Sequence, residues 1–187
     1  VDGLAPAGLE RDSLGNNAGM QSTIHVDAFG PAAVLRIIAP RLEAPFLLIR
    51  AALTHMYANG FGRIINVSSV HGSRASPFKS AYVSAKHGLE GLSKVTALEG
   101  GEYGVTSNCI NPGYVRTPLV EKQIVDQAKV HGIPEAEVLA KVMLTESAVK
   151  RLVEPEEVAS LVAWMASDHA GMVTGSSYVM DGGWSAR

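Results

Sequence analysis

The sequence predicts an α/β fold in which a doubly wound parallel sheet is covered by helices on both faces. Short runs at residues 63–68 and 105–110 are rich in β-branched side chains, as expected of buried parallel strands. Between them, residues 80–98 carry small and apolar side chains at helical spacing, with charged side chains on the other faces. Strands that alternate with helices in this way indicate a parallel sheet.

The remaining elements follow from local signals. Pro45 predicts the start of a helix that ends at Asn59 and Gly60. Its apolar stripe is Phe46, Ile49, Leu53 and Met56. Further helices are expected from Pro134 toward Ala148 and over residues 158–166, and a last strand over 176–180. Residues 1–43 are expected to be irregular, because residues 39–41 interrupt a helical pattern that runs from 32 to 38.

Length and composition indicate a single domain spanning residues 1–187, with an irregular part at 1–43 and a regular part at 44–187. Of the 187 residues, 47% are hydrophobic, and the 16 basic and 18 acidic residues form no basic run. Nucleic acid and membrane surfaces are therefore not expected partners. The single cysteine, Cys109, cannot form an intrachain disulfide, and no apolar run reaches the ~18 residues of a spanning helix. We expect a cytoplasmic protein that acts on small molecules.

Tyr82 and Lys86 are the first candidates for catalysis. They are four residues apart on an expected helix, so the ammonium group lies beside the phenol on one face. A phenol with an ordinary pKa of ~10 is a poor base at neutral pH, but an adjacent cation favours the phenolate. An alcohol that loses a hydride needs such a base for its hydroxyl proton. Ser69, at the end of a strand, can hydrogen-bond the same substrate oxygen.

Four motifs occur in the order that is typical of the short-chain dehydrogenase/reductase family, which this sequence resembles closely from about residue 44 onward. They are Asn16-Asn-Ala-Gly19, Ser69 with Tyr82-Val-Ser-Ala-Lys86, Asn111-Pro-Gly-Tyr-Val-Arg-Thr117 and Asp181-Gly-Gly183. The resemblance implies a Rossmann-like fold with Ser69, Tyr82 and Lys86 as catalytic residues. It also implies a nicotinamide cofactor, NAD with NADP left open. The implied cofactor-binding residues are Asn17, Ala18, Gly19, Tyr82, Lys86, Pro112, Gly113, Val115 and Thr117.

Several polar residues resemble those of the bacterial 3-hydroxybutyrate dehydrogenases within this family. The implied substrate-binding residues are Gln21, Ser69, His71, Lys79, Tyr114, Gln123 and Trp184. Such a set suits a small hydroxy acid, because a lysine supplies a compact positive charge for the carboxylate and the other side chains supply directed donors. The histidines form no cluster with Cys109 or with carboxylates, so no metal is expected. The helices at 45–59 and 80–98 resemble those that pair across subunits in the family, which implies a homotetramer.

The sequence departs from the family in two places. Only 15 residues precede Asn16, so the βαβ unit and glycine-rich turn that normally hold the pyrophosphate are missing or degraded. Residues absent from this sequence, a genuine truncation or a garbled amino terminus would each explain this, and a disrupted amino terminus would leave an exposed sheet edge. The second departure is Arg41, which stands where the family has an asparagine that holds a relay water.

Two functions of different classes therefore remain open. The first is an enzyme that oxidises 3-hydroxybutyrate to acetoacetate with NAD. The second is a catalytically silent member of the family that acts as an oligomerisation or binding module. A third reading keeps the enzyme class but changes the substrate, as in a 3-oxoacyl reductase, and that reading would need a surface for a long acyl carrier.

Overall fold

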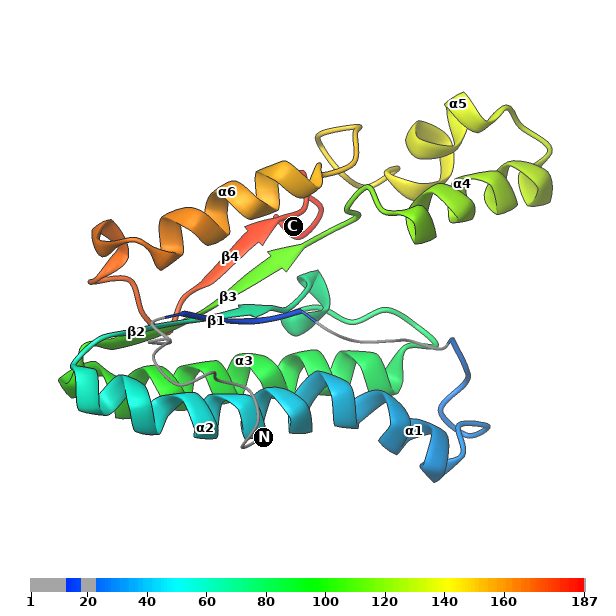
Figure 1. The fold of residues 1–187 in the computed structure, drawn as a ribbon. Coiled ribbons are helices and arrows are strands. Elements are labelled where there is room, and N and C mark those ends of the chain that lie inside the picture. The colour runs from blue at the N-terminus through cyan, green and yellow to red at the C-terminus, as the bar shows by residue number, and fades with distance from the viewer. Residues whose placement is uncertain (1–12, 18–22, 187) are drawn as a thin grey trace.

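The computed structural model describes residues 13–17 and 23–186, which form a parallel sheet with helices on both faces (Figure 1). In the described part, the strands are β1 (Ser13–Asn16), β2 (Gly62–Val67), β3 (Val105–Pro112) and β4 (Ser177–Met180). They lie in this order across the sheet, and each neighbouring pair is parallel. The α/β, Rossmann-like fold is confirmed. All eight residues of β3 are buried, as expected of a central parallel strand.

Helices cover the sheet unequally. On one face lie α1 (Pro31–Ile38), α2 (Ala44–Asn59) and α3 (Ser80–Gly100), and on the other lies α6 (Pro155–Ala166) (Figure 1). Between β3 and α6 come α4 (Pro118–His131) and α5 (Glu135–Val138), which project beyond the end of the sheet and which we call the α4–α5 arm (Figure 1). Short 3-10 turns span Val70–Gly72, Gly101–Tyr103 and Asp168–Ala170.

Two apolar clusters hold the helices to the sheet. Successive strand residues point to opposite faces, so Ile64 and Ile65 of β2 belong to different clusters. Ile64 packs on the side of α2 with Ile49, Met56 and Val105. Ile65 packs on the side of α6 with Ile110 and Met165. Both faces of β2 and β3 are thus covered, which fixes the carboxyl ends of these strands in space.

The expectation that residues 1–43 are irregular is wrong for residues 31–43. The helix begins at Pro31 rather than at Pro45, and it passes into α2 through a wider π-helical turn at Ala39–Glu43. Proline disrupts an ordinary α-helix because it has no N–H and its ring meets the carbonyl four residues earlier. In the π turn, the N–H of Ala44 bonds instead to the oxygen of Ala39. Ile37 is buried in a cluster with Phe29 and Ala81, which stabilises this extra helix.

Two other expectations need smaller corrections. The helix expected from Pro134 toward Ala148 is shorter, because α5 passes into a π turn at Leu139–Met143 and ends there. Phe46 lies in the expected apolar stripe of α2, yet 49% of it is exposed. Ile49 and Met56 are buried as expected. Among the described residues, β1 forms one edge of the sheet, and no described helix is long and apolar enough to cross a membrane.

Candidate active site

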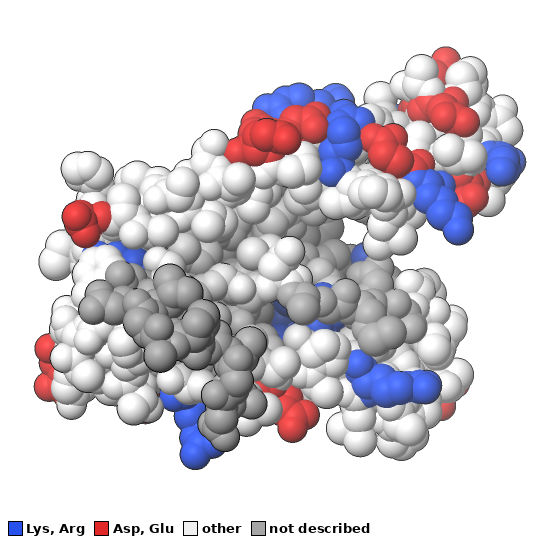
Figure 2. All heavy atoms as spheres, in the orientation of Figure 1, with Lys and Arg blue, Asp and Glu red and all other residues white. Residues whose placement is uncertain are grey.

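The carboxyl ends of the strands open into one large cavity. It has a volume of about 1110 Å³ and lies between the sheet, α3, α6 and the α4–α5 arm. Figure 2 shows the molecule hollowed between the arm and the body that carries α1. Ligands of open parallel sheets bind at the carboxyl ends of the strands, so the position of this cavity is the expected one.

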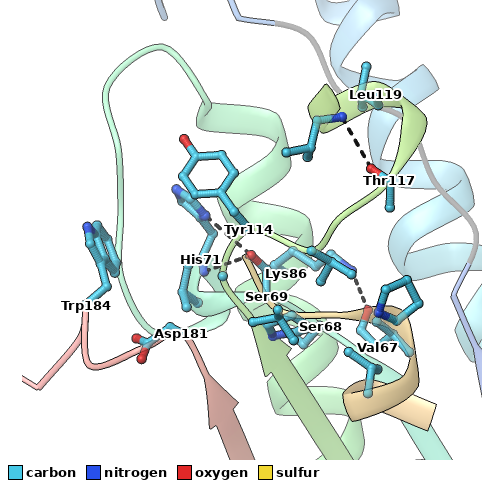
Figure 3. Close-up of a pocket in the computed structure, with 18 of the residues that line it drawn as sticks. Val67, Ser68, Ser69, His71, Lys86, Tyr114, Thr117, Leu119, Asp181 and Trp184 are labelled. Atoms are coloured by element: carbon cyan, nitrogen blue, oxygen red, sulfur yellow. Dashed lines mark hydrogen bonds between the residues drawn. The ribbon is translucent and has the colours of Figure 1, made fainter. Parts of the chain in front are cut away.

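Ser69 lies where the chain leaves β2. It is extended, with φ −172°, and it caps the 3-10 turn Val70–Gly72 by accepting a 3.2 Å hydrogen bond from the N–H of His71 (Figure 3). Its Oγ also lies 3.4 Å from Nδ1 of His71. Although the residue is buried against the protein, Ser69 lines the cavity. A capped serine at the end of a fixed strand holds its hydroxyl in one place.

Tyr82 and Lys86 lie one turn apart near the start of α3, and both line the cavity. The Nζ atom of Lys86 donates a 2.6 Å hydrogen bond to the carbonyl oxygen of Val67 and lies 6.0 Å from the centre of the Tyr82 ring (Figure 3). Burial, followed by the charge of Arg41, lowers the pKa of Lys86 to about 8, although Cys109 and Glu90 act in the opposite direction. Lys86 is therefore mostly a cation near pH 7.

Beneath these residues, a buried carboxylate links three elements. Glu90 of α3 accepts a 2.6 Å hydrogen bond from Nδ2 of Asn111 and another 2.6 Å bond from the hydroxyl of Ser177. Nδ2 of Asn111 also donates to the carbonyl oxygen of Ser69 at 2.9 Å. Gly72 leaves room for the carboxylate, since a Cβ there would lie 2.5 Å from Oε1 of Glu90. The sequence analysis did not identify Glu90 or Asn111 as parts of the site. The sequence signal that could have identified Glu90 is its position four residues after Lys86.

Most of the candidate substrate residues line the same cavity. Lys79, Tyr114, Gln123, His71 and Trp184 all line it. The His71 ring lies 5.6 Å from that of Tyr82 and 6.2 Å from that of Trp184, between centroids. Burial, followed by the charges of Lys79 and His87, lowers the pKa of His71 to about 4, so the imidazole is neutral at pH 7. Burial also lowers the pKa of Lys79.

The turn that carries Trp184 is fixed by Asp181, which follows β4 (Figure 3). Its carboxylate accepts 2.8 Å hydrogen bonds from the N–H groups of Gly183 and Ser185. Burial alone would raise the pKa of Asp181, but these hydrogen bonds outweigh burial and lower it. The Asp-Gly-Gly motif of the sequence therefore acts as the support of a side chain that lines the cavity.

Five of the candidate cofactor residues also reach this cavity. Asn17, Pro112, Gly113, Val115 and Thr117 line it together with Tyr82 and Lys86. Thr117 accepts a 3.4 Å hydrogen bond from the N–H of Val120 and so begins α4 (Figure 3). The remaining cofactor candidates, Ala18 and Gly19, and the substrate candidate Gln21 lie outside the described residues.

Arg41 is a cavity residue that the sequence marked only as a departure from the family. Its guanidinium carbon lies 4.5 Å from the centre of the Tyr82 ring.

No group of three or more His, Cys, Asp and Glu side chains within residues 13–17 and 23–186 could hold a metal ion. Cys109 is buried, and burial followed by the charge of Glu90 raises the pKa of its thiol to about 12. It is therefore not a candidate nucleophile.

Comparisons with known proteins agree with this geometry. The sequence profile described as "Enoyl-(Acyl carrier protein) reductase" matches residues 9–185. The chain therefore belongs to the short-chain dehydrogenase/reductase family, a class of oxidoreductases. It is 52% identical over 176 residues to the D-beta-hydroxybutyrate dehydrogenase of Rhizobium meliloti, and 44% identical to that of Cupriavidus necator. Both matches cover 94% of this chain and 68% of the relative.

Solved structures support the same assignment. A 4-hydroxyisoleucine dehydrogenase complexed with NADH and succinate superposes with a TM-score of 0.84 at 32% identity, covering 96% of this chain and 70% of that one. A proposed 2-deoxy-d-gluconate 3-dehydrogenase from Agrobacterium tumefaciens, solved with bound NADP, gives a TM-score of 0.83 at 28% identity. That match covers 94% of this chain and 68% of the other. Neighbours of this fold thus bind either nicotinamide cofactor.

Proposed function

We propose that the chain oxidises 3-hydroxybutyrate to acetoacetate with NAD. The observation that carries the proposal is that one cavity is lined both by Ser69, Tyr82 and Lys86 and by Lys79, Gln123 and Trp184. The first three residues supply proton-transfer chemistry, and the second three suit a small anion. The similarity to two D-beta-hydroxybutyrate dehydrogenases favours this substrate over others of the family.

The residues present fit the nicotinamide end of a cofactor. The cavity lies at the carboxyl ends of parallel strands, and the buried ammonium of Lys86 is a donor for ribose hydroxyls there. Asn17, Pro112, Gly113, Val115 and Thr117 would hold the rest of this end. Bound NAD supplies the carbon that accepts the hydride. One structural neighbour is complexed with NADH and another has bound NADP, so both cofactors are compared in the test below.

Three side chains carry out the proton transfer and hold the substrate oxygen. Tyr82 is the base that takes the hydroxyl proton of the substrate, and Lys86 stabilises the resulting phenolate. Ser69 accepts a hydrogen bond from the N–H of His71, which leaves its own hydroxyl proton for the substrate oxygen. That bond holds the oxygen in line with Tyr82.

Recognition of the carboxylate rests on Lys79. His71 is neutral at working pH and its Nε2 lies 2.9 Å from Oγ of Ser76, so the imidazole is fixed by its neighbours. Among the candidate substrate residues, Lys79 is therefore the one that carries a positive charge, while Gln123 and Trp184 line the same cavity. A compact ammonium pairs well with a carboxylate that lies away from water.

Steady-state kinetics with 3-hydroxybutyrate and NAD test the proposal. Tyr82→Phe is expected to reduce kcat by about 10²–10⁴-fold. Lys79→Ala is expected to raise KM for 3-hydroxybutyrate about 10-fold or more with a smaller effect on kcat. Lys94→Ala, on the exposed side of α3, is the matched control and should change neither. Unchanged kinetics in Lys79→Ala would remove 3-hydroxybutyrate from consideration.

Calorimetric titration separates the enzyme from a silent binding module. Micromolar binding of NAD supports the enzyme, and millimolar or absent binding supports the silent reading. Titration with NADP in parallel decides between the cofactors. Turnover of a 3-oxoacyl thioester, with no turnover of 3-hydroxybutyrate, would favour a reductase such as the acetoacetyl-CoA reductase of Rhizobium meliloti, to which this chain is 36% identical.

We further propose a homotetramer that uses α2 and α3. Four large apolar residues on these helices are exposed: Phe46 by 49%, Leu47 by 40%, Val95 by 52% and Leu98 by 85%. Exposed apolar side chains on adjacent helices are typical of a subunit interface. Light scattering after gel filtration should give the mass of four chains, and Leu98→Glu should reduce it. A monomer at micromolar concentration would contradict the proposal.

A further inference from the structure

Arg41 occupies a position from which it can act on the reacting tyrosine. The π turn Ala39–Glu43 carries Arg41 next to α3, and the guanidinium carbon lies 4.5 Å from the centre of the Tyr82 ring. This is well within the ~6 Å over which a cation and an aromatic ring attract each other. Arg41 and Tyr82 line the same cavity.

Two cations therefore flank one phenol. Lys86 lies on the helix of Tyr82, with Nζ 6.0 Å from the ring centre, and Arg41 approaches from a different element. The geometry makes Arg41 the nearer of the two to the ring. The remaining charged or titratable side chains that line this cavity are His71, Lys79, Tyr114, Glu146, Arg151 and Asp181. His71, at 5.6 Å between ring centres, is neutral near pH 7 and adds no charge.

Arg41 interacts electrostatically with both Tyr82 and Lys86. Burial lowers the pKa of Arg41, and its Coulombic interaction with Tyr82 acts in the opposite direction. Arg41 in turn contributes to the lowered pKa of Lys86. A guanidinium remains charged at every working pH, so it acts as a permanent charge beside the ring. Such a charge stabilises an anion more than a neutral phenol.

We propose that Arg41 is a second positioning cation of the site, which stabilises the phenolate of Tyr82 and extends proton transfer to lower pH than Lys86 alone would allow. The proposal rests on the proposed dehydrogenase function, because it assigns Arg41 a role in the same proton transfer. It gives the residue that replaces the usual asparagine a defined task in this chain.

Carbon-13 NMR of the full chain with labelled tyrosine Cζ tests the proposal without turnover. The resonance of Tyr82 among the 5 tyrosines is assigned by its loss in Tyr82→Phe. In Arg41→Asn and Arg41→Gln, the pH midpoint of the Tyr82 ionisation is expected to rise, because a neighbouring cation has been removed. Arg41→Lys keeps the charge and should restore most of the shift. Arg50→Asn, an exposed arginine of α2, is the control for loss of a helical arginine.

Kinetics then connect the titration to the reaction. The acidic limb of the kcat/KM profile for 3-hydroxybutyrate should move upward by the same amount in Arg41→Asn and Arg41→Gln. If the wild-type chain is inactive but the NMR midpoint shifts, the proposed function fails and the role of Arg41 in phenol ionisation stands. If the midpoint is the same in both folded variants as in wild type, the inference about Arg41 is wrong, whatever the activity.

Discussion

The ammonium of Lys86 donates a 2.6 Å hydrogen bond to the carbonyl oxygen of Val67, the last residue of β2. This bond ties α3 to the sheet at the point where the cavity begins. It also uses one of the three donors of the ammonium, which leaves two for ligands. A buried lysine that is anchored in this way presents its charge in a fixed direction.

Lys86→Met tests that anchor, because methionine keeps an unbranched apolar stem but has no charge. We expect kcat to fall by about 10²–10⁴-fold and NAD binding to weaken. The free energy of unfolding should change by only about 1–2 kcal/mol, since a lost hydrogen bond is partly offset by removal of a buried charge. The measurements are steady-state kinetics, NAD calorimetry and urea unfolding, with Lys94→Met as control. Activity within tenfold of wild type would contradict the assigned role.

The pKa of about 8 for Lys86 also predicts an alkaline limit of cofactor binding. Below this pH the side chain is charged and can hold ribose hydroxyls as a donor, and above it the charge is lost. NAD affinity should therefore decline as pH rises through about 8. Calorimetry between pH 6.5 and 9.5 checks this, and an affinity that is constant across the range would be inconsistent with it.

The sequence predicted β2, β3 and α3 to within two residues at either end, because buried parallel strands and long helices have strong periodic patterns. It failed at residues 31–43. Pro40 was interpreted as a break, whereas burial of Ile37 against Phe29 and Ala81 carries the helix past it. That burial depends on a partner more than 40 residues away in the sequence, so no local pattern could reveal it.

The residues of the candidate site also fall into two groups, those that local sequence patterns predict and those that depend on packing between elements. Spacing on one helix put Tyr82 beside Lys86, and strand-end position brought in Ser69, so these could be predicted together. The contact between Arg41 and Tyr82 depends on a π turn, and the bond between Glu90 and Asn111 joins a helix to a strand. Both depend on how elements pack, which a sequence pattern does not specify. The catalytic roles of all these residues remain predictions.

His71 predicts how stability changes with pH. Its pKa is about 4 in the folded chain and 6.5 ordinarily, so between these values the unfolded state binds a proton that the folded state does not. The free energy of unfolding should therefore fall as pH drops from 6.5 to 4. Because water reaches part of the ring, we expect a contribution of about 1–2 kcal/mol. Urea unfolding at pH 7 and 4.5 should show that His71→Gln loses this dependence, while His131→Gln, on the exposed side of α4, keeps it.

The α4–α5 arm has an apolar cluster of its own, and Leu152 is its fully buried anchor. Leu152→Ala should cost about 2–5 kcal/mol of packing, mainly within the arm. Because Gln123 lies on α4, KM for 3-hydroxybutyrate should rise while the sheet remains intact. Hydrogen exchange should accelerate over residues 118–143 and not in β2 or β3, and Met172→Ala, at a 97% exposed site, should leave it unchanged. Equal acceleration throughout would mean that the arm is not an independent unit.

Glu90 supports the site by accepting hydrogen bonds from Asn111 and Ser177, and these bonds can be tested separately from its charge. Glu90→Ala leaves Ser177 without its acceptor and frees Asn111 to move away from the carbonyl of Ser69. We expect the free energy of unfolding to fall by about 2–4 kcal/mol, from lost hydrogen bonds and an unfilled space. We also expect kcat to fall about tenfold with little change in NAD affinity, because Ser69 acts on the substrate oxygen.

Glu90→Gln distinguishes the geometry of these bonds from the charge of the carboxylate. Its amide oxygen can accept from Asn111 while its amide nitrogen donates to the hydroxyl of Ser177, so both contacts survive. This variant should therefore keep most of the stability and of kcat, and Glu99→Ala, exposed on the same helix, should match wild type. Should Glu90→Gln lose as much kcat as Glu90→Ala while remaining folded, the carboxylate acts through its charge on Lys86, and its role as a support of Ser69 is wrong.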